Sequence, residues 1–128
     1  MRLMRGRTRV TCNQMVVESE LSEAQTDRLF HALSASTRRD ILRRTMTREV
    51  SVSELSGSYR MSFAAVQKHV AVLEEAGLIA KRTSGRTRLV RADPRRIAQV
   101  RALLEQYEDL WRGRVDRLDA LLADPATD

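Results

Sequence analysis

The feature that most constrains the fold is an abrupt change of pattern at Gly77. The run MSFAAVQKHVAVLEEAG, residues 61–77, places Val66, Val70 and Leu73 on one narrow face of a helix. Directly after it, LIAK and TRLVRA have the pattern of two short strands joined by the turn signal TSGR. The sequence therefore predicts a helix that ends at a glycine and leads at once into a β-hairpin.

The outer face of this helix has an unusual composition. Opposite the apolar stripe lie small and polar residues, with no acidic residue until the third turn: Ala64, Gln67, Lys68, Ala71 and Glu75. Ser62 is a capping residue at the start of the helix. A face of this kind can lie close against a flat, hydrogen-bonding surface.

The hairpin is strongly basic. The stretch KRTSGRTRLVR, residues 81–91, contains five cations and no carboxylate. If the loop consists of Ser84 and Gly85, Lys81 faces Arg88 across the strand pair, and like charges in that position cost stability. A polyanion would remove the repulsion, so the hairpin is a candidate nucleic-acid contact. The alternative is a basic hairpin that is only solvated.

Three helices are predicted before residue 61. The first follows a capping box of Ser22 and Gln25, and the third, a short one, follows a second box of Ser51 and Glu54. The middle helix spans about 36–47. Its apolar residues are expected to face inward and its arginines outward; the inward set is Ile41, Leu42 and Met46, and the outward set is Arg38, Arg39, Arg43 and Arg44.

The last predicted helix starts at Asp93-Pro94 and runs for about 28 residues. Its apolar residues recur every three or four positions and form a stripe along the whole helix. A domain this small cannot cover so long a stripe. We expect self-association through this helix. The dimerisation residues would include Leu104, Tyr107, Trp111 and Leu118. The alternative is an exposed, partly frayed helix.

Charge and composition divide the chain into four parts. Residues 1–20 are expected to form a disordered basic arm, 21–93 a folded domain, 94–124 the dimerisation helix and 125–128 a tail. Met15 is an alternative start. The net charge is +6; residues 62–92 carry six cations against two acids, whereas 97–128 carry four cations against seven acids. A basic end and an acidic end suggest two different contact surfaces.

These motifs resemble the ArsR-type family of bacterial transcription regulators. The resemblance rests on STRRDIL, VSEL, MSFAAVQKHVAVLEEAGLI and GRTRLVRADP, and it covers roughly residues 25–95. It implies a winged helix-turn-helix of order α-α-α-α-β-β-α, mostly helical with a small β-hairpin, which dimerises through the terminal helices. The implied function is that of a homodimeric repressor that binds double-stranded DNA and often regulates its own promoter.

The resemblance also indicates which residues would contact DNA. Helix 62–77 would enter the major groove, and hairpin 79–91 would be the wing on the flanking backbone or minor groove. Gln67 is a plausible reader of adenine and Lys68 a donor to guanine or phosphate. Phe63 could contact a thymine methyl or form a core edge, and His69 could contact phosphate or pack against a helix. The full expected set is Ser62, Phe63, Ala64, Gln67, Lys68, His69, Arg82, Arg86 and Arg88.

Other function classes have weaker support in the sequence. The family's Cys-x-Cys metal ligands align with Ser51 and Ser53, whose hydroxyls cannot replace thiolates, so neither a metal nor another cofactor is expected. A metal-responsive repressor that uses Cys12, or a winged-helix module that binds a protein partner, remains an alternative. No catalytic motif is visible, so the chain is not expected to be an enzyme. The lone cysteine and the lack of an apolar span suggest a cytoplasmic protein that does not enter membranes. A small molecule between the last helices, near Tyr107 and Trp111, is one candidate inducer.

Overall fold

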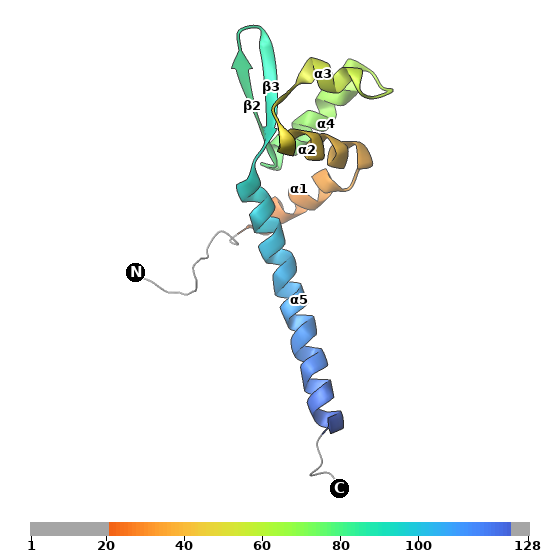
Figure 1. Cartoon of the computed structure of the whole chain (residues 1–128), viewed down its shortest axis with the longest axis vertical. Helices are drawn as coiled ribbons and strands as arrows, with labels where there is room; N and C mark the ends of the chain where they lie inside the picture. Colours follow the sequence, from red (N-terminus) through yellow and green to blue (C-terminus); the bar gives the residue numbers. More distant parts are fainter. Residues whose placement is uncertain (1–20, 124–128) are drawn as a thin grey trace, which may run out of the picture.

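The structure is a computed structural model that describes residues 21–123. Four helices and a small sheet form a compact head, and one long helix leads away from it (Figure 1). The elements follow the order α1 Glu23–Leu33, α2 Ser36–Thr47, β1 Val50–Ser51, α3 Val52–Gly57, α4 Phe63–Glu75, β2 Ile79–Ser84, β3 Thr87–Ala92 and α5 Pro94–Ala123. The fold is the predicted mostly helical arrangement with an antiparallel hairpin.

Local hydrogen bonds explain most helix boundaries. The capping box of α1 is complete, because the Ser22 hydroxyl accepts from the Gln25 amide and the Gln25 side chain accepts from the Ser22 amide. The second box is only half formed. Ser51 accepts from the Glu54 amide, but the Glu54 carboxylate pairs with Arg48 instead of returning to the cap.

The hairpin belongs to a three-stranded antiparallel sheet of order β1-β3-β2. The sequence did not indicate β1, which is two residues long and pairs Val50 with Val90. The predicted hairpin register was wrong. The turn consists of Gly85 and Arg86, so Lys81 faces Val90 and Arg88 faces Thr83.

The conformation of Gly85 is compatible with the observed register. Its φ is +63°, and a glycine at the first central position suits a type II′ hairpin turn. Relative to a Ser84-Gly85 turn, the observed turn lies one residue later, so each β2 residue pairs with a β3 residue two positions further along the chain. Because side chains alternate between faces, a shift of two leaves every side chain on the same face of the sheet. Lys81 and Arg88 are thus diagonal neighbours on one face, and the direct opposition of like charges does not occur.

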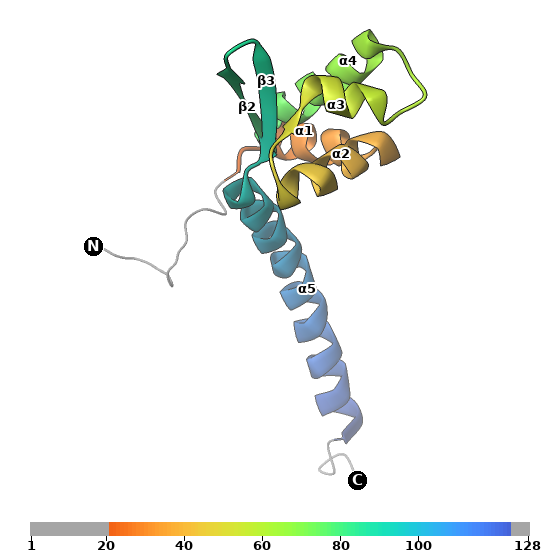
Figure 2. The ribbon, with the colours of Figure 1, turned by 45° about the horizontal axis from the view of Figure 1, so that its top comes forward.

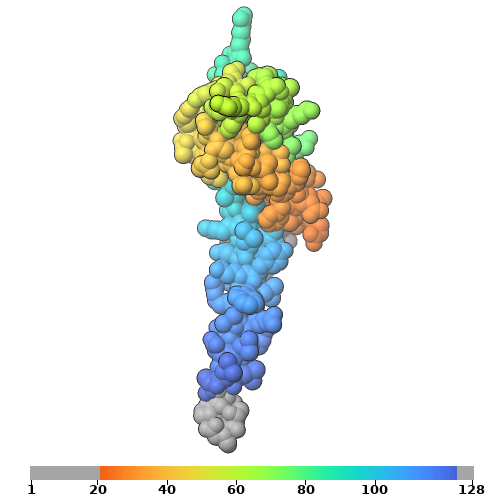
Figure 3. Space-filling model, turned by 90° about the vertical axis from the view of Figure 1, so that its right-hand side faces the viewer, coloured from red at the N-terminus to blue at the C-terminus, as the bar shows by residue number. Residues whose placement is uncertain are grey.

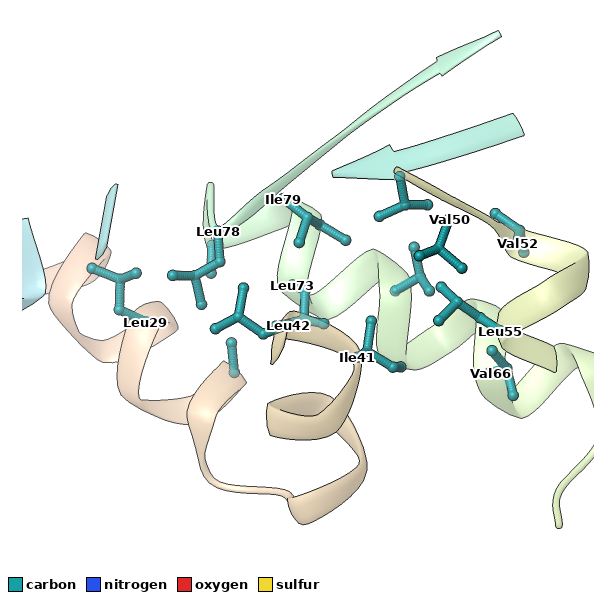
Figure 4. Close-up of a cluster of buried hydrophobic side chains, with 14 residues drawn as sticks. Leu29, Ile41, Leu42, Val50, Val52, Leu55, Val66, Leu73, Leu78 and Ile79 are labelled. Carbon is teal, nitrogen blue, oxygen red and sulfur yellow. The ribbon is translucent and has the colours of Figure 1, made fainter. Parts of the chain in front are cut away.

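The core is aliphatic and lies between the helices and the sheet. Every helix of the head, together with the sheet, contributes to it (Figure 4). Val66, Val70 and Leu73 of α4 are buried as the stripe predicted. With these side chains turned inward, the opposite face of α4 is left on the surface.

The predicted faces of α2 need two corrections. The buried positions are Arg38, Ile41, Leu42 and Thr45, which follow the helical repeat. Met46, expected inside, is 51% exposed, and Arg38, expected outside, is only 8% exposed. The Thr45 hydroxyl tolerates burial because it donates to carbonyls of the preceding turn.

Arg38 can be buried because its guanidinium donates hydrogen bonds to three different acceptors. Nε reaches the Ala32 carbonyl at 2.9 Å, Nη2 reaches the His31 carbonyl at 3.0 Å, and Nη1 lies 3.0 Å from His69 Nδ1. These bonds join the end of α1 and the middle of α4 to α2. A hydrophobicity pattern cannot anticipate them, because their acceptors are mostly backbone carbonyls.

The end of α4 is fixed against the start of α5. Gly77 has φ +78°, and the Leu78 amide donates to the Leu73 carbonyl at 3.0 Å, which is a Schellman ending. A Cβ at position 77 would lie 2.6 Å from Nε of Arg96. The Arg96 side chain therefore occupies the space that glycine leaves, at the point where the end of α4 and the start of α5 meet.

Helix α5 extends far beyond the head, toward the end of the molecule opposite the hairpin tip (Figures 1 and 2). It is 30 residues long, close to the predicted length, and none of its residues is buried. Among residues 21–123, no helix is both long enough and apolar enough to span a bilayer.

We predict that Arg38→Ala lowers the free energy of unfolding by about 2–4 kcal/mol, because buried carbonyls lose their donor. Urea denaturation followed by circular dichroism measures the change. Arg39→Ala is the matched control: Arg39 also donates to a carbonyl, that of Leu33 at 2.7 Å, but on the surface. We expect this control to cost less than about 1 kcal/mol. Equal losses in the two variants would contradict a central role for Arg38.

Candidate nucleic-acid interface

The exposed face of α4 begins at a capped helix end. The Ser62 hydroxyl accepts from the Ala65 amide at 3.1 Å, so the helix starts cleanly at Phe63. The first amides of a helix have no intrahelical acceptor and can donate outward. Five of the nine predicted DNA-contacting residues are exposed around this end: Ser62, Phe63, Ala64, Gln67 and Lys68.

A hollow of about 330 Å³ lies between this helix end and the hairpin. Its lining comes from the start of α3, the first turns of α4 and the hairpin turn; the residues are Ser51, Val52, Ser53, Phe63, Gln67, Arg86, Thr87 and Arg88. The hairpin tip projects beyond the helices (Figure 3). The hollow therefore brings predicted residues of the helix and of the wing to one place.

The structure divides the wing cations into two groups. Arg82 makes a two-pronged ion pair with Glu49, with both nitrogen–oxygen distances at 2.7 Å, and Lys81 lies 3.3 Å from Glu74. Arg82 shares a sheet face with Leu89, whereas Arg88 lies on the other face. Within the described residues, neither Arg86 nor Arg88 has an ion-pair partner, so their charge is available to a ligand.

The Arg82–Glu49 pair also changes the protonation of the carboxylate. The hydrogen bonds from Arg82 are the main reason that the pKa of Glu49 is lowered, and the charge of Arg91 adds to the effect. Glu49 is thus ionised at neutral pH and holds Arg82. Sequence pattern could not reveal this pair, because the two residues are far apart in the chain and meet only across β3.

His69 faces the interior side of α4. Burial, assisted by the charge of Arg38, lowers the pKa of His69, so the ring is neutral at neutral pH. Because a guanidinium can only donate, Nδ1 of His69 accepts and the ring proton is on Nε2. Of the two roles considered for His69, helix packing matches this contact.

The turn before α4 is tied to α2 by a polar cluster that the sequence did not suggest. The Tyr59 hydroxyl donates to Asp40 at 2.5 Å, and Arg44 donates to Asp40 at 2.9 Å and to the Ser58 hydroxyl at 3.2 Å. The Arg44 guanidinium also lies 5.4 Å from the centre of the Tyr59 ring. This cluster holds the connection between α3 and α4 against α2.

The same cluster perturbs two pKa values. Hydrogen bonds from Tyr59 and then Arg44 lower the pKa of Asp40. Burial, followed by the bond to Asp40, raises the pKa of Tyr59 to about 12. The phenol is therefore a donor and the carboxylate an acceptor across the whole physiological range.

The four predicted dimerisation residues lie on the surface of α5. Leu104, Tyr107, Trp111 and Leu118 are exposed, with Trp111 at 62%. Leu110, Leu121 and Leu122 add exposed apolar surface to the same helix. The guanidinium of Arg114 lies 5.8 Å from the centre of the Trp111 ring.

The positions aligned with metal ligands carry hydroxyls. Ser51 serves as the cap of α3, and both Ser51 and Ser53 line the hollow. In the part of the chain that the structure describes, no group of three or more histidine, cysteine or acidic residues is arranged to hold a metal ion. Cys12, the residue of the metal-responsive alternative, lies outside that part, as does the predicted basic arm.

Comparisons with known proteins agree with this architecture. The family model of the bacterial regulatory proteins of the arsR family matches residues 35–81. The HTH-type transcriptional regulator Rv2034 of Mycobacterium tuberculosis is 35% identical over 81 residues, which cover 63% of this chain and 76% of that protein.

Two solved structures have the same fold. An ArsR-like transcriptional regulator from Rhodococcus sp. RHA1 has a TM-score of 0.71 at 27% identity, and the match covers 77% of this chain and 91% of the other. The homodimeric winged helix-turn-helix DNA-binding domain of Mb0332 from Mycobacterium bovis has a TM-score of 0.55 at 22% identity, with 70% and 89% covered.

The head, with its exposed helix beside a basic hairpin, has the fold of a winged helix-turn-helix domain. The sequence matches show the family: the chain belongs to the ArsR family of bacterial transcriptional regulators. Regulators of this family act by binding DNA and are not enzymes.

We predict that the Asp40 cluster stabilises the protein in a pH-dependent way. Since the pKa of Asp40 is lowered on folding, its contribution is complete above the unfolded value of about 3.9 and is lost as pH falls through the folded value. Urea denaturation between pH 6 and pH 3 should give a steeper acid loss for wild type than for Asp40→Asn. Tyr59→Phe should give an intermediate slope. An Asp40→Asn slope identical to wild type would remove the cluster from the explanation.

Proposed function

We propose that the chain is a homodimeric repressor that binds a specific operator, with α4 in the major groove and the β2–β3 wing on the flanking backbone. The observation that supports this proposal is the shared hollow, whose lining brings Gln67 of α4 together with Arg86 and Arg88 of the hairpin. Gln67 is suited to the adenine edge and Lys68 to guanine or phosphate. Arg86 and Arg88 would neutralise phosphates beside them.

The charge arrangement supports this orientation. Arg82 and Lys81 are held by acids of the protein, whereas the cations at the hairpin turn have no such partner among the described residues. We therefore assign the electrostatic part of DNA binding mainly to Arg86 and Arg88. Arg82 would fix the hairpin to the sheet edge through Glu49, and would influence DNA only through the position of the wing.

We propose that a second copy of the chain covers the apolar face of α5. The face is too large to remain in water in one chain alone, since Leu104, Tyr107 and Trp111 are all at least half exposed. Two heads joined in this way would present two α4 helices to half-sites about one helical turn apart, roughly 34–36 Å.

We predict that Arg86→Ala weakens binding to all duplexes and reduces the slope of log affinity against log salt by about one per protomer. A dimer with about eight phosphate contacts should have a slope near −7 in wild type. Fluorescence anisotropy over a salt series, on a duplex selected from a random pool, measures both quantities. Gln67→Ala should instead relax the preference at particular base pairs and keep the slope.

Arg117→Ala is the control for net charge, because Arg117 is an exposed cation near the far end of α5. It should leave the slope unchanged. If Arg86→Ala and Gln67→Ala both bound the selected duplex like wild type, the assignment of the DNA-binding surface would be wrong.

We predict that Trp111→Asp raises the dissociation constant of the dimer about 30-fold or more, because a central apolar anchor is replaced by a charge. Analytical ultracentrifugation over a concentration series gives the constant. Ala98→Asp is the control, since Ala98 is exposed on the opposite face of α5. A wild-type chain that remains monomeric at every concentration would exclude the homodimer.

A further inference from the structure

Phe63 is the one large apolar side chain in the lining of the hollow. It is the first residue of α4 and is 47% exposed. Packing against the core therefore accounts for only part of its surface. The cap beneath it fixes its backbone, because the Ser62 hydroxyl and carbonyl hold the amides of Ala65 and Val66.

Phe63 and Gln67 lie one helical turn apart. Residues four positions apart on a helix are neighbours on the same side, with Cβ atoms about 5–6 Å from each other. Successive bases along a DNA strand are about 3.4 Å apart. Two side chains with this spacing can therefore reach neighbouring base pairs in the major groove. Among the groups exposed in that groove, the C5 methyl of thymine is the one that an aromatic side chain contacts.

We infer that Phe63 reads the C5 methyl group of a thymine in a base pair next to the one that Gln67 contacts. This inference rests on the proposed function, and it adds that each half-site contains an A·T pair recognised by its methyl group. The polar groups around Phe63 would remain in contact with water or phosphate while the methyl covers the ring.

A protein partner fits the hollow less well. A stable protein interface needs about 800 Å² from each partner, with a core of several apolar groups. Here the lining has one exposed apolar side chain, Phe63, and one buried one, Val52; the other lining residues are Ser51, Ser53, Gln67, Arg86, Thr87 and Arg88. A cationic and polar lining with one exposed apolar group matches a nucleic-acid major groove and its flanking phosphates.

The test removes one methyl group at a time from DNA. The full chain is used to select a duplex from a random pool, and each thymine of that duplex is then replaced singly by uracil, which differs only in the C5 methyl. Wild type should lose about four-fold in affinity at one thymine of each half-site. Replacing that T·A pair by a C·G pair should weaken binding, and 5-methylcytosine in the same C·G pair should recover about four-fold of the loss.

Protein variants connect the effect to Phe63. Phe63→Ala should bind more weakly and become insensitive to the uracil substitution, whereas Phe63→Leu should keep most of the sensitivity. Phe30→Ala is the control, because Phe30 is comparably exposed but lies on α1. Thermal unfolding of each variant establishes that it is folded.

The outcomes separate this inference from the function on which it rests. If wild type bound every uracil duplex as tightly as the parent, or if Phe63→Ala kept the full penalty, the role of Phe63 would be refuted while operator binding stood. If the chain bound no duplex in preference to another, the proposed function and the inference would both fail.

Discussion

The burial of three side chains, Val66, Val70 and Leu73, is the interaction on which the proposed DNA-binding surface depends. They hold α4 against the other helices and the sheet by a single narrow stripe. Because the stripe is narrow, the rest of the helix circumference remains available for other contacts. The polar bonds around it then set the details: Arg38 joins α1, α2 and α4, and Tyr59 ties the turn before α4 to Asp40. A hydrophobic contact supplies the stability, and charged hydrogen bonds supply the orientation.

Most of the fold could be predicted because its signals are local. The cap at Ser62, the glycine at 77 and the change of period after it depend on residues close in sequence, and the helices lie where these signals indicated them. The hairpin register could not be predicted in this way, because Ser84-Gly85 and Gly85-Arg86 are both acceptable two-residue turns. Strand β1, which pairs with β3, is also too short to leave a sequence pattern.

The sequence indicated which residue types gather at the candidate site, but not which of them form ion pairs with one another. The sequence gathers arginines on the hairpin, yet it cannot tell that Glu49 holds Arg82 while Arg86 and Arg88 have no acidic partner in the described chain. It also treats Arg38 as a surface residue, because a burial rule based on hydrophobicity has no means to count carbonyl acceptors from another helix. Long-range ion pairs and buried charges are where pattern reasoning fails in this protein.

Gly77 has a consequence for the spacing of DNA contacts. The Arg96 side chain is packed where a Cβ at position 77 would otherwise lie, so the end of α4 is in contact with the beginning of α5. In the proposed dimer, each head would be attached to the shared pair of α5 helices through such a junction. The pairing of the α5 helices would then set the distance between the two α4 helices. That distance determines how many base pairs an operator can have between its two half-sites, and the wings and the heads themselves would not change it.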